Sequence, residues 1–175
     1  MKYTNLPDGF MDEYHNIFKK RSNIEINIMS KDDPTIFAYH FLGKKLRPHQ
    51  AFMMKRLMFA MKSKCKRLVM CLARQLGKSI GLGIFLLWAV WYNKFPATIH
   101  KITTVYIVSR DDEAAVELLD KIRLLIYDGD NYMSQFKIGG KTVNNYFSRY
   151  TKEPNNTHQL TFSNNSFIKS IPPTG

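Results

Sequence analysis

The feature that most constrains the fold is the stretch Leu68–Ser79, in which a short apolar run leads into Gly77-Lys78-Ser79. Residues 68–73 are typical of a buried strand, and a long apolar run begins directly afterwards at Ile80. A strand, a tight turn, Gly-Lys-Ser and a helix, in this order, are the layout of a phosphate-binding P-loop. The stretch therefore predicts a phosphate site.

The residue types suit that chemistry. Backbone N–H groups at the start of the helix point at phosphates, and the helix dipole favours negative charge there. Gly77 lets the backbone approach closely, while Lys78 is expected to reach the β- and γ-phosphates and the Ser79 hydroxyl to ligate Mg²⁺. The usual pattern has another glycine five residues before Gly77, where this chain has Leu72. The alternative is a Gly-Lys-Ser at an ordinary strand-to-helix turn.

Length and charge limit the possible functions. The 175 residues are enough for one domain with a core. The chain has 26 Lys and Arg against 14 Asp and Glu, a formal net charge of +12. Such an excess favours an anionic partner, with nucleic acid first and an anionic membrane second. The alternative is a surface excess that only aids solubility.

Other patterns argue against membrane, secreted and metal-binding classes. The longest apolar run, 80–92, is shorter than the roughly 20 residues of a membrane span, so we expect a buried core helix. The N-terminus is polar and shows no signal peptide, so the chain is not expected to be secreted. Cys65 and Cys71 have no other metal-ligating residues at suitable spacing, which favours reduced thiols in a cytosolic protein.

The region before the P-loop has weak signals at first and then a clear helix. Residues 12–20 fit a short helix, Glu25–Ile28 alternates like a strand, and 31–34 has the composition of a loop. Pro48 is expected to open a helix that ends at Ser63 and Lys64. Its apolar stripe is expected to pack in the core: Met53, Met54, Leu57, Met58 and Met61.

After the P-loop helix, residues 93–96 break the pattern and 103–108 have the composition of a second buried strand. Ser109 is expected to cap a helix that ends near residues 128–130. Its apolar stripe consists of Ala115, Leu118, Leu119, Ile122, Leu125 and Ile126.

The last part of the chain divides in two. Residues 131–157 are polar and Asn-rich, with a turn at residues 139–140, and are expected to be an irregular surface excursion. Residues 158–162 and 167–171 alternate around Ser163-Asn164-Asn165-Ser166, which predicts a β-hairpin.

The middle of the chain therefore reads strand, P-loop, helix, strand, helix. This order predicts an α/β fold, a P-loop NTPase-like parallel sheet flanked by helices and incomplete at its C-terminal end. Ligands are expected beyond the carboxyl ends of the strands, where Ser109-Arg110-Asp111 would lie on the same sheet edge as the P-loop.

Three blocks stand in a recognisable order: Leu46–Gln50, then Ala73–Ser79, then the strand, helix and hairpin of residues 105–171. Together they resemble the N-terminal ATPase region of the large terminase subunit of tailed bacteriophages, the motor that packages DNA. Terminases use a variant P-loop in which the first glycine is often lost and Arg-Gln precedes x-Gly-Lys-Ser/Thr, so Leu72 fits the family. The resemblance covers residues 44–175, while residues 1–43 carry no motif with a known role.

The resemblance implies roles for the matching residues. Gln50 would read adenine, because an amide offers a donor and an acceptor to that edge; the alternative is a polar residue at a helix start. Arg74 would act as a cis arginine finger on the transferring phosphoryl group; the alternative is a surface arginine that only adds positive potential. The implied residues that bind ATP and Mg²⁺ are Gln50, Arg74, Gln75, Leu76, Gly77, Lys78 and Ser79, with Ser79 on the metal.

One expected feature is missing. Terminases have an apolar strand that ends in Asp-Glu, which holds Mg²⁺ and activates water. No Asp-Glu pair here follows such a strand, because Asp12-Glu13 precedes the P-loop and Asp112-Glu113 lies at a helix start. The family's C-terminal endonuclease domain has no counterpart either. We expect an N-terminal piece that does not hydrolyse ATP by itself, unless Asp111 or Glu113 supplies the carboxylate.

The resemblance also implies partners. These are double-stranded DNA, the portal, the small terminase subunit and further copies of the chain in a ring motor, all in the host cytoplasm and without a membrane. A helicase-like nucleic-acid-dependent ATPase is the second hypothesis, although such P-loops usually retain the glycine that Leu72 replaces. The third hypothesis is a non-enzymatic basic nucleic-acid-binding module in which Gly77-Lys78-Ser79 is incidental.

Overall fold

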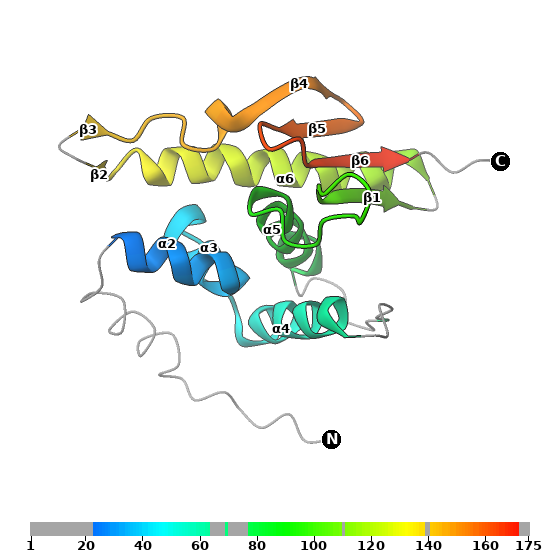
Figure 1. Cartoon of the computed structure of the whole chain (residues 1–175), viewed down its shortest axis with the longest axis horizontal. Coiled ribbons are helices and arrows are strands. Elements are labelled where there is room, and N and C mark those ends of the chain that lie inside the picture. Colours follow the sequence, from blue (N-terminus) through cyan, green and yellow to red (C-terminus); the bar gives the residue numbers. More distant parts are fainter. Residues whose placement is uncertain (1–22, 64–68, 70–76, 110, 139–140, 172–175) are drawn as a thin grey trace.

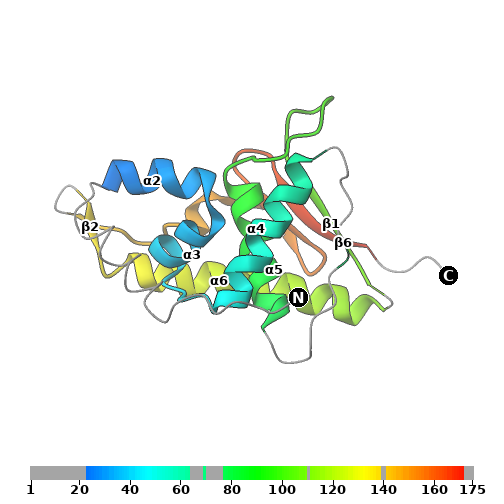
Figure 2. The same cartoon turned by 90° about the horizontal axis from the view of Figure 1, so that it is seen from below.

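A computed structural model describes residues 23–63, 69, 77–109, 111–138 and 141–171 of the chain. Over these residues the protein has an α/β fold, in which a mixed four-stranded sheet has the described helices on one side (Figures 1 and 2). The predicted strand 68–73 and the predicted helix 12–20 lie outside the described residues, apart from Val69.

Helix α5 (Lys78–Trp91) is the apolar helix that the sequence predicts. Ile84, Leu87 and Trp88 are almost fully buried, so its role as a core helix is confirmed. It packs closely across α6 (Asp112–Met133), because a Cβ atom on Gly83 would lie 3.2 Å from Leu125 Cδ1. No helix in the described ranges combines the length and apolarity needed to cross a membrane.

Helix α4 (Pro48–Lys62) begins at the predicted proline, and Ser63 forms its C-cap as expected. Met53 and Met54 are buried, which confirms that this part of the stripe packs in the core. Met61, at the far end of the stripe, is instead 36% exposed.

The sheet has the order β1-β6-β5-β4, formed by β1 (Thr104–Val108), β4 (Thr151–Asn156), β5 (Gln159–Phe162) and β6 (Phe167–Ile171). Strands β5 and β6 form the predicted hairpin, and Asn165 adopts the left-handed conformation with φ of 65° in its turn. Among the described strands only β1 and β6 are parallel, so the described sheet is mixed rather than parallel.

Strand β1 forms where the sequence predicts it, but it is not buried. Ile107 is its one buried residue, while Tyr106 and Val108 are 55% and 69% exposed. The reason is that α5 and α6 cover one face of the sheet, and alternate side chains of β1 point to the other face. Strand β1 also lies at an edge of the described sheet.

Helix α6 differs from its predicted bounds at both ends. Its N-cap is Asp111 and not Ser109, because the Asp111 carboxylate accepts a hydrogen bond from Ala114 N at 2.8 Å. The helix also continues through Gly129 to Met133. A Cβ atom on Gly129 would lie 2.6 Å from Phe147 Cε2, so this glycine permits close packing and does not end the helix.

The predictions for residues 25–34 are wrong. Helix α2 (Asn23–Asp32) replaces the predicted strand, and Asp33 alone separates it from α3 (Pro34–Leu42). The Asp33 carboxylate caps α3 by accepting from Thr35 N at 2.7 Å. Helix α2 is held by a distant contact, since Trp88 Nε1 donates to the Ser30 carbonyl at 2.8 Å.

Residues 134–157 are more ordered than predicted. They include β2 (Lys137–Ile138), β3 (Lys141–Thr142), a short 3₁₀ helix η1 (Ser148–Tyr150) and β4. Phe147 is fully buried, and its backbone N–H donates to the buried Asp130 carboxylate of α6 at 2.5 Å. Most of the described part of this segment is exposed, as predicted, but it is not irregular, and Val143 and Phe147 pack in the core.

Candidate functional site

Gly77 has the backbone conformation that the P-loop prediction requires. Its φ of 68° is left-handed, and it stands immediately before α5 as the N-cap. Its carbonyl accepts from Gly81 N at 3.0 Å, the first hydrogen bond of the helix. Among the described residues, no side chain forms a capping hydrogen bond at the start of α5. The N–H groups of this helix start are therefore oriented in the way that favours an anion.

Gln50 joins the starts of α4 and α5. Its Nε2 donates to the Gly77 carbonyl at 3.2 Å, and its Oε1 accepts from Arg47 N at 2.9 Å. The contact is close, because a Cβ atom on Gly77 would lie 2.6 Å from Gln50 Nε2. The side chain is only 9% exposed. An amide can donate twice and accept twice, so one N–H and one lone pair remain for a ligand.

A cavity of about 270 Å³ opens beside the start of α5. Its polar lining consists of Lys78 and Ser79 from the predicted motif and of Glu117 and Lys121 from α6. The remaining lining residues are Met53, Leu82, Ala114 and Leu118. The cavity therefore places the Gly-Lys-Ser motif against the first turns of α6, the helix that follows β1.

Sequence reasoning missed Glu117 and Lys121. They are one helical turn apart and form an ion pair, with Lys121 Nζ 2.5 Å from Glu117 Oε1. Their spacing alone indicates only a surface pair on a helix. Their proximity to Lys78 depends on how α5 crosses α6, and no local sequence signal specifies that crossing.

Other candidate residues are not brought into the cavity. Asp111 is engaged at the N-cap of α6, and neither Asp111 nor Glu113 is among the lining residues. Arg74, Gln75 and Leu76 lie outside the described residues, so their predicted roles stay predictions. Within the described ranges, no three His, Cys, Asp or Glu side chains form a group able to hold a metal ion.

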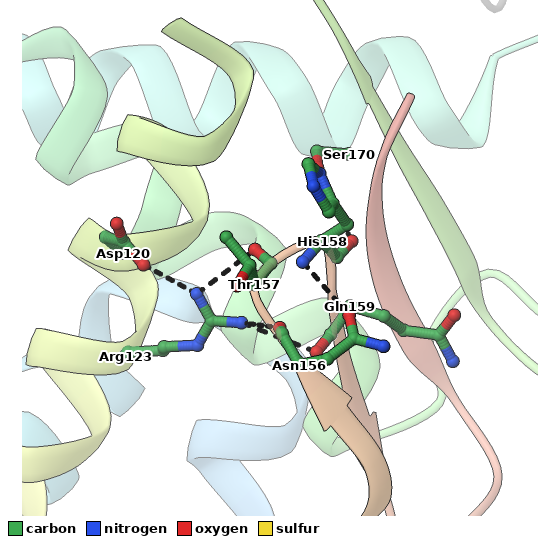
Figure 3. A network of polar contacts seen from close by, with 7 residues as sticks. All are labelled: Asp120, Arg123, Asn156, Thr157, His158, Gln159 and Ser170. Carbon is green, nitrogen blue, oxygen red and sulfur yellow. Dashed lines mark hydrogen bonds and ion pairs between the residues drawn. The ribbon is translucent and has the colours of Figure 1, made fainter. Parts of the chain in front are cut away.

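A second polar cluster joins α6 to the turn between β4 and β5 (Figure 3). The Arg123 guanidinium lies 2.6 Å from Asp120 Oδ1 and donates to the carbonyl oxygens of Asn156, Thr157 and Gln159. These contacts fix the sheet on the helix, so the cluster has a structural role.

His158 lies near a serine and an aspartate, but the arrangement is not a catalytic triad. Its Nδ1 is 3.0 Å from Ser170 Oγ and 3.6 Å from Asp112 Oδ1. A triad needs the acid and the nucleophile on opposite ring nitrogens, so that one orients the ring while the other loses its proton. Here both contact the same nitrogen, so the geometry does not activate Ser170.

Comparison with known proteins adds no family to these observations. A scan against models of protein families finds no match, and a search of curated proteins finds none. The interpretation of the cavity therefore depends on its own residues.

Proposed function

We propose that this chain is the N-terminal part of a phage DNA-packaging motor, the large terminase subunit. It binds ATP through a variant P-loop, and the complete protein uses ATP to drive double-stranded DNA into the prohead. Residues 44–175 form part of the P-loop ATPase domain, and residues 1–43 precede it. The portal, the small subunit and further copies of the chain are its partners in the host cytoplasm.

The observation that carries this proposal is the hydrogen bond between Gln50 and Gly77. The two residues are 27 positions apart and belong to the two motifs of the resemblance, and Gln50 Nε2 lies 3.2 Å from the Gly77 carbonyl oxygen. A polar residue at a helix start explains only the bond from Arg47 N to Gln50 Oε1, which caps α4, and gives no reason for the second bond to Gly77. The left-handed conformation of Gly77 at the start of α5 supports the same function.

The cavity suits an anionic group. Lys78 supplies positive charge, Lys121 is paired with Glu117, and the Ser79 hydroxyl would ligate the Mg²⁺ that accompanies ATP. A volume near 270 Å³ lies at the lower end of ligand pockets, so it would hold phosphates and not the whole nucleotide. Arg74 is proposed as the residue that stabilises charge on the transferring phosphoryl group.

Binding and hydrolysis are separate in this proposal. Neither Asp-Glu pair of the sequence, at 12–13 and 112–113, follows an apolar strand-like run, so the isolated 175 residues are expected to turn over ATP negligibly. Glu117 is the one carboxylate that lines the described cavity, but it is 64% exposed and paired with Lys121. Turnover that depends on Lys78 and is lost in Glu117→Gln would assign water activation to Glu117 and contradict this expectation.

Equilibrium titration with ATP and Mg²⁺ tests the proposal. We expect Lys78→Ala to weaken ATP binding at least tenfold, because it removes the cation nearest the helix start. Lys137→Ala is the matched control, since Lys137 is an exposed lysine on β2, outside the cavity lining. Equal ATP affinity in wild type and Lys78→Ala would refute the P-loop and favour the non-enzymatic nucleic-acid-binding module.

A further inference from the structure

The net positive charge of the chain arises from one continuous region. Residues 34–110 contain 14 Lys and Arg and no Asp or Glu, while the rest of the chain contains 12 Lys and Arg and 14 Asp and Glu. The acid-free region therefore accounts for more than the whole net charge of +12. Its central helix is α4, which contains no acidic residue.

The outer face of α4 combines positive charge with exposed aromatic rings. Phe52 and Phe59 are 48% and 69% exposed, and Lys55, Arg56 and Lys62 are exposed beside them. The Arg56 guanidinium lies over the Phe52 ring, 4.9 Å from its centroid. Positions 52 and 59 are two turns apart, so the rings share one face and are about 10 Å apart along the axis.

We propose that this outer face of α4 is the DNA-contacting surface of the chain. Lysine and arginine contact the phosphates of the DNA duplex, and the aromatic rings beside them pack against its sugars. An anionic membrane is a poorer occupant, because two phenylalanines among three cations on one short helix bury little apolar area. The inference extends the proposed function, because it names the surface that would hold the DNA.

Helix α4 also contacts the phosphate site from its other face. Gln50 in its first turn bonds Gly77, and Met53 lines the cavity. The packing is tight, since a Cβ atom on Gly81 would lie 2.5 Å from Met53 Cε. Helix α4 thus contacts the nucleotide cavity with one face and carries the DNA-contacting surface on the other.

Fluorescence anisotropy with labelled duplex and single-stranded DNA tests the inference on the full chain. The charge variant is Lys55→Glu/Arg56→Glu, and its control is Lys137→Glu/Lys141→Glu, an equal reversal at exposed lysines of β2 and β3. We expect the α4 variant to lose at least tenfold in affinity. The slope of log affinity against log salt for the duplex should fall by about 2, since each lost phosphate contact removes about 0.9.

The aromatic rings are tested separately. Phe52→Ala/Phe59→Ala should weaken duplex DNA binding more than Leu124→Ala/Tyr127→Ala, which removes side chains of α6 exposed by 61% and 64%. Circular dichroism melting verifies that each variant is folded. DNA affinity unchanged in the α4 charge variant, or lowered equally in its control, would overturn the inference. The inference would also be overturned if poly-glutamate displaced the labelled DNA as effectively as unlabelled DNA of equal charge does.

The ATP and DNA affinities of the variants distinguish an error in this inference from an error in the proposed nucleotide site. Lys78→Ala should lose ATP and keep DNA binding, while the α4 charge variant should lose DNA and keep ATP. If wild type binds no ATP but its DNA binding depends on α4, the nucleotide site is refuted and the DNA surface stands.

Discussion

Replacing Gln50 separates its structural contribution from its effect on the nucleotide. Gln50→Ala removes the hydrogen bonds to Arg47 N and to the Gly77 carbonyl. At about 1 kcal/mol net for each, the free energy of unfolding should fall by about 2 kcal/mol. For a chain of this size the melting temperature should then fall by about 4–8 °C.

Gln50→Glu provides the sharper comparison. The carboxylate can still accept from Arg47 N, but it cannot donate to Gly77 and places a charged oxygen against that carbonyl oxygen, so the loss of stability should exceed the roughly 1 kcal/mol of one hydrogen bond. It also places negative charge at the phosphate end of α5, so ATP should bind roughly tenfold more weakly than to Gln50→Ala, equivalent to about 1.4 kcal/mol.

Urea unfolding and calorimetric titration with ATP and Mg²⁺ measure the two effects. Met61→Ala is the control on the same helix, because Met61 is partly exposed in the last turn of α4 and should change stability by less than about 0.5 kcal/mol. The reasoning is refuted if Gln50→Ala unfolds like wild type, or if Gln50→Glu binds ATP as well as Gln50→Ala.

Three further perturbations test the packing around the site. Gly77→Ala should cost at least about 1 kcal/mol in urea unfolding, because a left-handed φ of 68° and contact with Gln50 leave no room for Cβ. Gly129→Ala should cost about 1–3 kcal/mol by the same measurement, since Cβ would meet Phe147 and Leu42; equal stability would contradict this packing. Burial, and then nearby Tyr146, raise the pKa of Tyr92 far above its usual 10. Stability at neutral pH should therefore be lost as pH rises above 10, and absorbance titration of Tyr92→Phe should lack one late-ionising phenol.

Local signals predicted the elements that need no distant partner. The start of α4 at Pro48, the apolar run of α5 and the β5–β6 hairpin all formed as expected, because a proline, an unbroken apolar run and an Asn-rich turn each act within a few residues. The α/β class followed from these elements.

The errors arose where distant contacts override local pattern. Residues 25–28 alternate like a strand, yet α2 is held by the bond from Trp88 to Ser30 and by one from Tyr92 to Asn27. Gly129 resembles a helix end, but tertiary packing requires a small residue there. These contacts join residues far apart in the chain, so the sequence around each residue does not predict them.

The sequence predicted only those residues of the candidate site that belong to the Gly-Lys-Ser motif. Gly77, Lys78 and Ser79 were recognisable because glycine, cation and hydroxyl occur in a fixed order. Glu117 and Lys121 became visible only once α5 was seen to cross α6. The positive charge of α4 is visible in the sequence, but whether it forms a binding surface depends on which side of the helix is exposed.

The central claim is that phosphates bind at the start of α5. Its most direct test is amide chemical-shift mapping of the chain during titration with ATP and Mg²⁺. We predict that the largest shifts are those of the Gly77, Lys78 and Ser79 amides, with smaller shifts at Glu117 and Lys121, and that adenosine without phosphates leaves them unchanged. Shifts confined to other parts of the chain, or equal shifts with adenosine, would contradict the claim.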